Sequence, residues 1–530
     1  MDIIENEKKK RTILYGLLVT VLVLIGVTYA YYRITKTQTN SNVIGTRTCL
    51  NTTLTEETSE IVLSDAFPIS DEDGLKQSPF TFTLTNNCDS YVKVTIALVS
   101  EYRTSTNTAY LKDNYVKSNL LTKGTNDGSS VILSTLSLGE VDTNTQGYVL
   151  KTTGLKNKEA KSFDLRLWLD SETTNEQDLN KTWKGKIVVS VVAAEYVPTF
   201  AETILANNEV KTPITTPGAA ISTADEAEFA STEDDDGTSY YFRGAVTNNY
   251  VEFANKCWRI VRVGGDGSVK LILHNDNTAG VANPCDSANN SASAAFARYS
   301  ETTYTSAFNT NYNDNAYVGF KYGTVGASDY ATTHANTNNS TILTNLEAWY
   351  NNNLKTYESV IDDNVWCNDK TNVTDETYDP WNYTPNGLGY ANNVTFYGAT
   401  QRLVSSTSGS AGGTGLSLKC NGKLSKITSK IGLITADELA FAGYAAGTTA
   451  GTGNTTTYLQ ENATDTYWWS LSPGNFYGNS ARVWIVGGSS GVFGHRSVGN
   501  TSAVRPSISL KSTTNVTGNG TSSSPFIISM

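Results

Sequence analysis

One uncharged apolar stretch stands near the start of the chain. Residues 12–32 contain no charged side chain, and the basic cluster at residues 8–11 precedes them. A helix of ~20 apolar residues spans a bilayer. Because basic flanks stay in the cytoplasm, we expect residues 1–11 inside, a single transmembrane helix over 12–32, and everything after the polar tether at 33–45 outside the cell.

Apolar and polar positions alternate strictly in the region from residue 46 to residue 197. The apolar members of four such segments are Phe80, Phe82 and Leu84; Val92, Val94, Ile96 and Leu98; Phe163, Leu165, Leu167 and Leu169; and Ile187, Val189 and Val191. Alternation places these side chains on one face of each strand. With turn-rich spacers between the segments, the pattern predicts an antiparallel, immunoglobulin-like all-β sandwich.

Three stretches have little apolar periodicity. Residues 198–232 contain several prolines and an alanine-rich stretch, which indicates a linker with one short helix at 223–230. Residues 286–335 are rich in Ala, Asn, Ser, Thr and Tyr, and we expect long surface loops there. Residues 512–530 are polar and are expected to form a C-terminal tail.

Residues 233–511 combine strand signals with helix signals. Alternating stretches at 257–263 and 268–273 flank a Gly-Gly-Asp-Gly sequence, which predicts a hairpin. Ser340 is an N-cap candidate for a helix with apolar residues at helical spacing. A capping box formed by Thr435 and Glu438 starts a second helix. Short strands follow to residue 511, so this region is predicted to be an α+β domain.

Composition narrows the class of protein. Only 17% of residues are charged, 10% are aromatic, and the net charge is −11. Nucleic-acid binding requires clustered cations, so the acidic balance argues against it. The six cysteines lack CxxC spacing, and an even number in an exported chain favours disulfides. Nearness in sequence suggests the pairs Cys49–Cys88, Cys257–Cys285 and Cys367–Cys420; six reduced thiols are the alternative.

No motif supports catalysis or a cofactor. The acidic run at residues 233–237 lacks the ligand spacing of an EF-hand, which favours a solvated turn over a Ca²⁺ site. His274, His334 and His495 have no nucleophile or carboxylate at a motif spacing, and none belongs to HExxH. A pair of carboxylates that meet only in space stays open. We therefore predict no enzyme activity, no metal and no cofactor.

The stretch from residue 468 to residue 511 is the best candidate for a binding surface. Trp468, Trp469, Leu471, Val504, Ile508 and Leu510 are expected to form its scaffold. Between them lie polar and aromatic residues of the kind that rigid binding surfaces present. The predicted ligand contacts are Asn475, Phe476, Tyr477, Asn479, Arg482, Trp484, Phe493, His495 and Arg496. The alternative is an ordinary sheet with a polar outer face.

The first region resembles a family. The segment GVTYAY at residues 26–31, FTLTNN at 82–87, SFDLRLWLD at 162–170 and KTWKGKIVV at 181–189 resemble the camelysin and biofilm-fibre group of Gram-positive bacteria. The resemblance implies an exported β-sandwich that can self-assemble. It also implies cleavage near Ala30, which would release the protein from the membrane.

The second region resembles another superfamily. Its WWSLSP opening at residues 468–473 and its VRP-containing last strand resemble C-type-lectin-like and formylglycine-generating-enzyme-like domains over about residues 240–511. The resemblance implies a ligand-presenting domain with residues 475–496 as its window. Residues 421–530 contain no cysteine, so the enzymatic role of that superfamily is not implied.

These observations predict a non-enzymatic bacterial surface protein. The C-terminal domain would bind an extracellular protein or glycan, and the β-sandwich would serve as a spacer. Two alternatives are a structural matrix or fibre protein, and a surface hydrolase.

Overall fold

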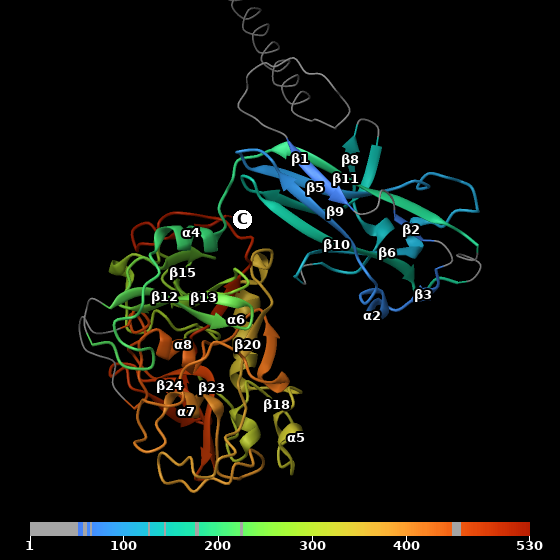
Figure 1. Cartoon of the computed structure of the whole chain (residues 1–530). Helices are drawn as coiled ribbons and strands as arrows, with labels where there is room; N and C mark the ends of the chain where they lie inside the picture. Colours follow the sequence, from blue (N-terminus) through green and yellow to red (C-terminus); the bar gives the residue numbers. More distant parts are fainter. Residues whose placement is uncertain are drawn as a thin grey trace, which may run out of the picture. The chain divides into compact units, whose positions relative to one another are not determined.

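The computed structural model describes residues 51–529, except 57–60, 64–65, 126–127, 143–144, 175–179, 223–225 and 448–456. It is mostly β-sheet, with 39% strand and 14% helix. The chain forms two compact units, residues 1–197 and 198–530 (Figure 1). Among the described residues, no helix has the length and apolar character needed to cross a membrane. The predicted membrane segment at 12–32, with its flanks at 1–11 and 33–45, lies outside the described residues.

The first unit is a sandwich of two sheets. One sheet has the order β1 (Thr52–Glu56), β4 (Phe80–Asn86), β10 (Ala160–Asp170), β6 (Val116–Thr122) and β7 (Val131–Ile132), and β3 (Pro68–Ile69) pairs with β10. The other has the order β2 (Ile61–Leu63), β11 (Trp183–Ala193), β5 (Val92–Ser100), β9 (Thr145–Leu155) and β8 (Leu138–Asp142). The short helices are α2 (Asp71–Gly74), η1 (Asp113–Tyr115) and η2 (Leu133–Thr135).

The alternating residues form the core of this sandwich, as predicted. The four apolar residues of β5 from Val92 to Leu98 are fully buried. Phe82 and Phe163 are register partners in β4 and β10, and their rings lie 5.4 Å apart. A one-residue slip of either strand would expose its whole apolar set, so burial fixes the register. The β-sandwich prediction is therefore confirmed.

The second unit is built on two larger sheets. The first has the order β12 (Ala227–Asp234), β13 (Gly237–Gly244), β15 (Lys256–Val263), β14 (Tyr250–Phe253), β29 (Phe526–Ile528) and β28 (Val516–Thr517), with β16 (Val269–Asn275) bonded to β15 and to β27 (Ser507–Leu510). The second has the order β17 (Thr305–Ala307), β26 (Thr501–Ala503), β23 (Trp468–Tyr477), β24 (Ser480–Val486) and β25 (Phe493–Ser497), with β21 (Thr395–Phe396) bonded to β23. Two small sheets pair β18 (Lys321–Tyr322) with β19 (Asn338–Asn339), and β20 (Asn364–Cys367) with β22 (Lys426–Ser429).

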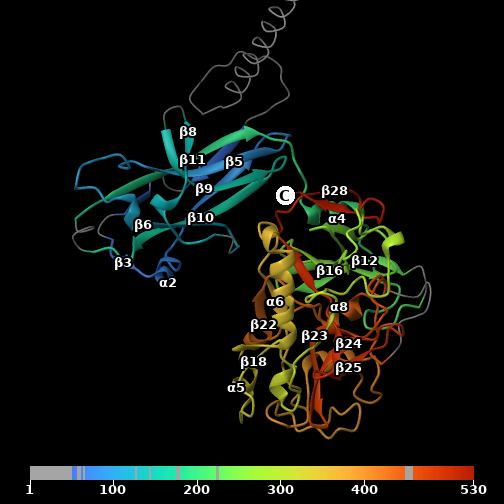
Figure 2. The same ribbon diagram turned by 180° about the vertical axis from the view of Figure 1, so that it is seen from behind.

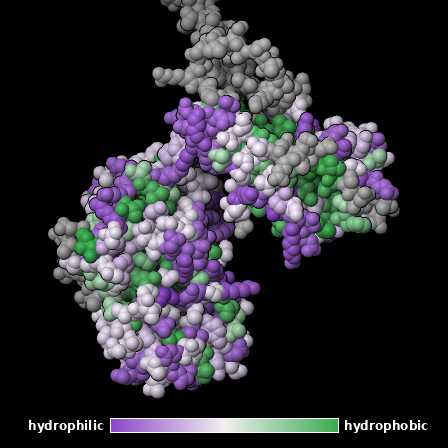
Figure 3. Space-filling model, in the orientation of Figure 1, coloured by the Kyte–Doolittle hydropathy of each residue, from purple (hydrophilic) through white to green (hydrophobic). Residues whose placement is uncertain are grey.

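Helices pack around these sheets. They are α4 (Phe200–Asn207), α5 (Tyr330–His334), α6 (Thr341–Asn353), α7 (Gly398–Leu403) and α8 (Ala436–Phe441), with 3₁₀ turns η3 (Ser287–Asn289), η4 (Asn315–Val318), η5 (Lys355–Tyr357) and η6 (Lys423–Ser425). The long helix α6 is drawn in yellow in Figure 2. The visible surface of this unit in Figure 3 is mostly hydrophilic or intermediate, with small separate hydrophobic patches.

Local sequence signals identified several of these elements correctly. The predicted hairpin is the antiparallel pair β15–β16. The Ser340 side chain accepts a hydrogen bond from the backbone N–H of Leu343 and caps α6. Both hydrogen bonds of the Thr435–Glu438 capping box are present at α8. This helix ends at Phe441, and Gly443 follows with a φ of +120°, a conformation that only glycine adopts cheaply.

Residues 198–232 do not form a linker. Phe200 and Ile204 of α4 are buried in the core of the second unit, and the ring centroids of Phe200 and Phe526 lie 5.2 Å apart. The helix expected at 223–230 is also wrong, because Ala227–Asp234 is strand β12. Strand pairing with β13 overrode the helix propensity of the alanines and glutamates.

Two further predictions are corrected by burial. Residues 512–530 are not a free tail, because β28 and β29 join the first sheet and β28 lies near α4 (Figure 2). Residues 286–335 are not surface loops throughout. Phe296, Phe308 and Phe320 are fully buried, although little regular structure surrounds them. Isolated aromatic residues in polar sequence therefore supply part of the core.

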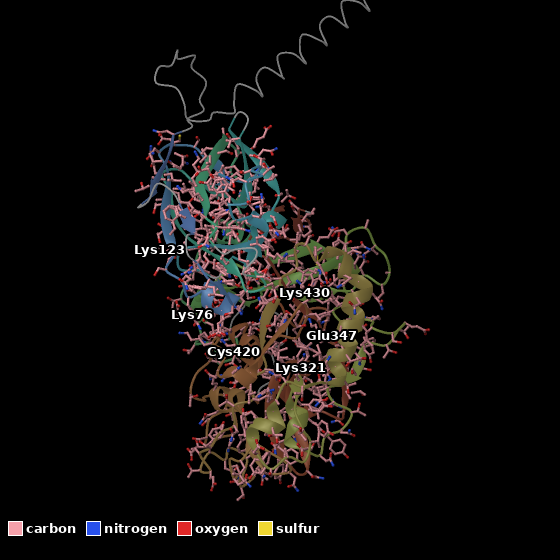
Figure 4. All side chains as sticks on the ribbon, turned by 90° about the vertical axis from the view of Figure 1, so that its right-hand side faces the viewer. Lys76, Lys123, Lys321, Glu347, Cys420 and Lys430 are labelled. Atoms are coloured by element: carbon pink, nitrogen blue, oxygen red, sulfur yellow. A yellow bond between two sulfur atoms is a disulfide. The ribbon has the colours of Figure 1, made fainter. Side chains whose placement is uncertain are left out.

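The predicted disulfides are present within the described residues. Cys257 pairs with Cys285, and Cys367 pairs with Cys420, which is labelled in Figure 4. Cys88 is also disulfide-bonded, while its expected partner, Cys49, lies outside the described residues. No described cysteine is free, so the alternative of reduced thiols is wrong.

The two described disulfides differ in exposure, which predicts their order of reduction. Cys257 and Cys285 are fully buried, whereas Cys367 and Cys420 are half-buried. An attacking thiolate must reach a sulfur atom, so mild reductant should open Cys367–Cys420 first. Loss of this bridge should lower the free energy of unfolding by about 4 kcal/mol. Timed alkylation and peptide mass spectrometry measure the order; equal rates of opening would contradict it.

Candidate functional site

Six of the nine predicted contact residues lie on one face of the sheet formed by β23, β24 and β25. Asn475 is the register partner of Arg482, Trp484 of His495, and Val486 of Phe493. Residues two apart in a strand share a face. The residues on this side, called the β23–β25 face, are Asn475, Tyr477, Arg482, Trp484, Phe493 and His495.

The other three predicted contacts do not belong to this face. Phe476 points the opposite way and is buried in the core. Arg496 also lies on the opposite side, with its guanidinium carbon 4.6 Å from the centre of the Tyr467 ring. Asn479 is exposed in the turn between β23 and β24, where Gly478 and Asn479 have φ values of 59° and 60°. Positive φ at both positions explains the Gly-Asn sequence as turn chemistry.

Part of the β23–β25 face is buried and cannot reach a ligand at the surface. Asn475, Trp484 and Phe493 are at most 1% exposed. The rings of Trp484 and Phe493 lie 4.7 Å apart, and the Trp484 Nε1–H donates to Thr400 Oγ1 of α7 at 3.2 Å. Figure 1 shows α7 beside β23 and β24. Trp484 therefore joins α7 to the sheet and Phe493 packs against its ring, which corrects their predicted role as surface contacts.

A segment distant in sequence closes over the exposed end of the face. The Trp381 ring lies 4.8 Å from the His495 ring at 85°. The Tyr383 ring stacks on Tyr477 at 3.7 Å and 6°. The half-buried residues Trp381, Tyr383, Tyr477, Arg482 and His495 together form what we call the aromatic patch. Trp381 and Tyr383 are not among the predicted contacts, although the aromatic-rich sequence YDPWNY at 378–383 is a signal that could have indicated them.

Three polar atoms at the aromatic patch have no hydrogen-bond partner. They are Asn475 Oδ1, Arg482 Nε and His495 Nδ1, each buried from solvent in the described structure. The Nδ2 atom of Asn475 lies 3.1 Å from His495 Nε2. Buried polar atoms are rarely left unpaired in proteins, because desolvation without a partner costs about 1–3 kcal/mol. Sixteen other buried polar atoms of the described residues also lack a hydrogen-bond partner, so it is the grouping of these three on one face that makes this a candidate site.

The protonation state of His495 follows from its surroundings. Burial, followed by the nearby Arg482 charge, lowers the pKa of His495 to about 4. The ring is therefore neutral at pH 7. With Asn475 Nδ2 donating to Nε2, the ring hydrogen lies on Nδ1. At neutral pH Arg482 and His495 of the aromatic patch thus each hold an unused N–H donor.

A second group of polar residues lines a cavity of about 60 Å³ in the second unit. Its charged groups form ion pairs: Arg262 Nη1 with Asp234 at 2.8 Å, Lys270 with Glu438 at 2.7 Å, and Arg402 with both Asp369 and Asp437. Asp234 is 7% exposed, so the acidic run at 233–237 is not a wholly solvated turn. No group of three or more described residues is arranged to hold a metal. Most of the charged residues that line this cavity therefore pair with one another.

A serine-hydrolase motif finds no geometric support among the described residues. The sequence GGSSG at 487–491 fits the letters of a nucleophile-elbow motif, but it is the turn between β24 and β25. That motif requires a strand followed by a helix. His274 and His334 are fully buried in the second unit.

No family model matches the chain, and no curated protein or solved structure shows significant similarity to it. The two family resemblances therefore remain predictions.

Proposed function

We propose that the chain is a non-enzymatic surface protein that binds an extracellular ligand through the aromatic patch. One observation carries the proposal: Trp381 and Tyr383, from a separate segment, meet Tyr477, Arg482 and His495 around three unpaired polar atoms. Aromatic rings with a few convergent polar groups are typical of ligand sites. Half-buried tyrosine, tryptophan and arginine are also the residues that dominate binding energy at interfaces.

In this proposal the two units have different roles. We assign the first unit to an immunoglobulin-like sandwich that acts as a spacer, and the second to a C-type-lectin-like domain that presents the aromatic patch. Disulfides in both units agree with an oxidising environment outside the cytoplasm. In this proposal residues 12–32 anchor the chain in the cell membrane, or are cleaved near Ala30 to release it. N-terminal sequencing of the exported protein distinguishes these two forms.

Removing the Trp381 and Tyr383 rings should weaken ligand binding strongly. Trp381→Ala with Tyr383→Ala in the full chain should raise the Kd for extracellular glycans or proteins at least about thirtyfold, the effect of losing a hot spot. The measurement is binding of the labelled chain to an immobilised panel of such molecules.

The matched control is Tyr467→Ala. Tyr467 is 39% exposed and lies with Arg496 on the opposite side of the same sheet. Binding should survive this change, and thermal unfolding should show that all variants fold. Equal loss in the control, or full binding by the double variant, would contradict the proposal.

A structural fibre protein remains the alternative. It predicts fibres by electron microscopy that disappear when residues 46–197 are deleted.

A further inference from the structure

Arg482 has no counter-ion among the described residues, unlike several other cations of the second unit. Arg262, Lys270 and Arg402 each contact at least one carboxylate at 3.0 Å or less. Among the described residues, no carboxylate lies within ion-pair distance of Arg482, and its Nε is buried without a hydrogen bond. An arginine held this way retains an unused charge and unused donors.

The groups around Arg482 leave this charge unneutralised. His495 is neutral at pH 7, as shown above. The pKa of Tyr383 is raised chiefly by burial, against a lowering by Arg482, so the phenol is also neutral. Asp379 lies near Tyr383 but makes no ion pair with Arg482, and its oxygens accept from the backbone N–H groups of Tyr383 and Thr384 at 2.6 and 2.8 Å. The five residues of the aromatic patch therefore carry one positive charge between them, in a chain of net charge −11.

The remaining groups define the rest of the ligand. Asn475 is fully buried and does not reach the ligand, although its Oδ1 has no hydrogen-bond partner. His495 Nδ1–H can donate to a second oxygen. The Trp381 and Tyr383 rings supply apolar surface beside these atoms. A carboxylate, a hydroxyl oxygen and an apolar ring face occur together in an acidic sugar.

We propose that the aromatic patch binds polysaccharides whose sugars carry carboxylates, with the carboxylate on Arg482. This inference rests on the proposed function, because it names the ligand class of the same site. Arginine is suited to the role, since its planar fork matches a carboxylate and makes charge-assisted hydrogen bonds.

Two polymers that differ only in the carboxylate provide the test. The full chain is titrated with polygalacturonate and with the fully methyl-esterified polymer at low salt. Esterification should weaken binding by roughly tenfold to a hundredfold, the effect of losing hydrogen bonds to a charged group. Arg482→Gln should produce a similar loss for polygalacturonate and little change for the ester.

Arg496→Gln is the matched control, because Arg496 is half-buried in the adjacent strand but lies on the opposite side of the sheet. This variant should bind within about twofold of the unchanged chain, the spread expected of a surface substitution. Trp381→Ala should weaken the binding of both polymers. Circular dichroism and thermal unfolding verify that each variant is folded.

The possible results separate this inference from the proposed function. Equal binding of both polymers, lost in Trp381→Ala and kept in Arg482→Gln, would overturn the carboxylate assignment and leave the aromatic patch as the binding site. If the chain binds neither polymer, the carboxylate assignment is also overturned. The binding experiment with the immobilised panel of extracellular molecules then still tests the proposed function. Equal loss in Arg482→Gln and Arg496→Gln would show nonspecific attraction and overturn the assignment too.

Discussion

Replacement of Glu438 by glutamine is expected to lower the free energy of unfolding by about 3–5 kcal/mol, because it leaves buried cations without their carboxylate. Glu438 is 3% exposed and accepts from Arg262 Nε at 3.0 Å and from Lys270 Nζ at 2.7 Å. Burial raises the pKa of Glu438, but Lys270 and Arg262 outweigh it and hold the value at about 2. Arg262 would keep Asp234, whereas Lys270 would lose its partner.

Glutamine at position 438 removes the ion pairs but keeps the helix cap, so the two contributions to stability can be distinguished. A Gln side chain can still accept from the backbone N–H of Thr435 in the capping box, so the loss should report the ion pairs. Glu209→Gln is the control, since Glu209 and Lys211 pair at 3.4 Å with side chains 80% and 58% exposed. Such a surface pair contributes at most about 1 kcal/mol.

Urea unfolding at pH 7 measures both variants. Equal, small losses for Glu438→Gln and Glu209→Gln would show that the buried network does not stabilise the unit.

Stability should fall steeply between pH 6.5 and pH 5, because the three histidines are held neutral in the folded chain. Burial, with nearby Arg259 and Arg505, places the pKa of His274 well below its ordinary value. Burial, with Lys370, lowers the pKa of His334 to about 3, and that of His495 is about 4. Below pH 6.5 the unfolded chain binds protons at these sites, whereas the folded chain does not.

The direction of the change in the free energy of unfolding follows from this difference in proton binding. Stability is retained above pH 6.5, where both states are neutral, and is lost as the pH falls below it. Each histidine contributes a slope of about 1.4 kcal/mol per pH unit, so three together approach about 4 kcal/mol per pH unit near pH 5. Glu438 acts in the same direction only below its unfolded pKa, near 4.5.

Denaturant unfolding at pH 7.5, 6.5, 5.5 and 5 measures the slope before the carboxylates titrate. His334→Gln should reduce the slope by about 1.4 kcal/mol per pH unit, whatever it does to stability at pH 7.5. A stability that stays constant from pH 7 to pH 5 would contradict the burial of these histidines.

Local patterns in the sequence predicted much of the fold. Strict alternation at Val92–Leu98 indicated a buried strand because a strand has two faces. Ser340 and Thr435 indicated helix starts because their side chains bond to backbone groups three residues away. Neighbouring cysteines indicated the bridges Cys257–Cys285 and Cys367–Cys420. The strand and helix signals depend on residues close together in the chain, and the bridges join cysteines that are consecutive in the sequence, 28 and 53 residues apart.

The local sequence patterns gave wrong predictions where contacts between distant segments decide the secondary structure or the packing. The alanine-rich stretch before residue 230 became strand β12 because β13 pairs with it. Phe200 and Phe526, one in a predicted linker and the other in a predicted tail, meet in one core. Burial of apolar surface depends on which segments come together, and composition alone does not contain that information.

The same distinction applies to the candidate site. The sequence placed it in the window of residues 475–496, since polar and aromatic residues alternate there on a hydrophobic frame. Only the strand register showed that six of the nine residues share a face, and only packing showed that Asn475, Trp484 and Phe493 are buried in it. Trp381 and Tyr383 reach His495 and Tyr477 across roughly a hundred residues of chain, because a site is formed by proximity in space.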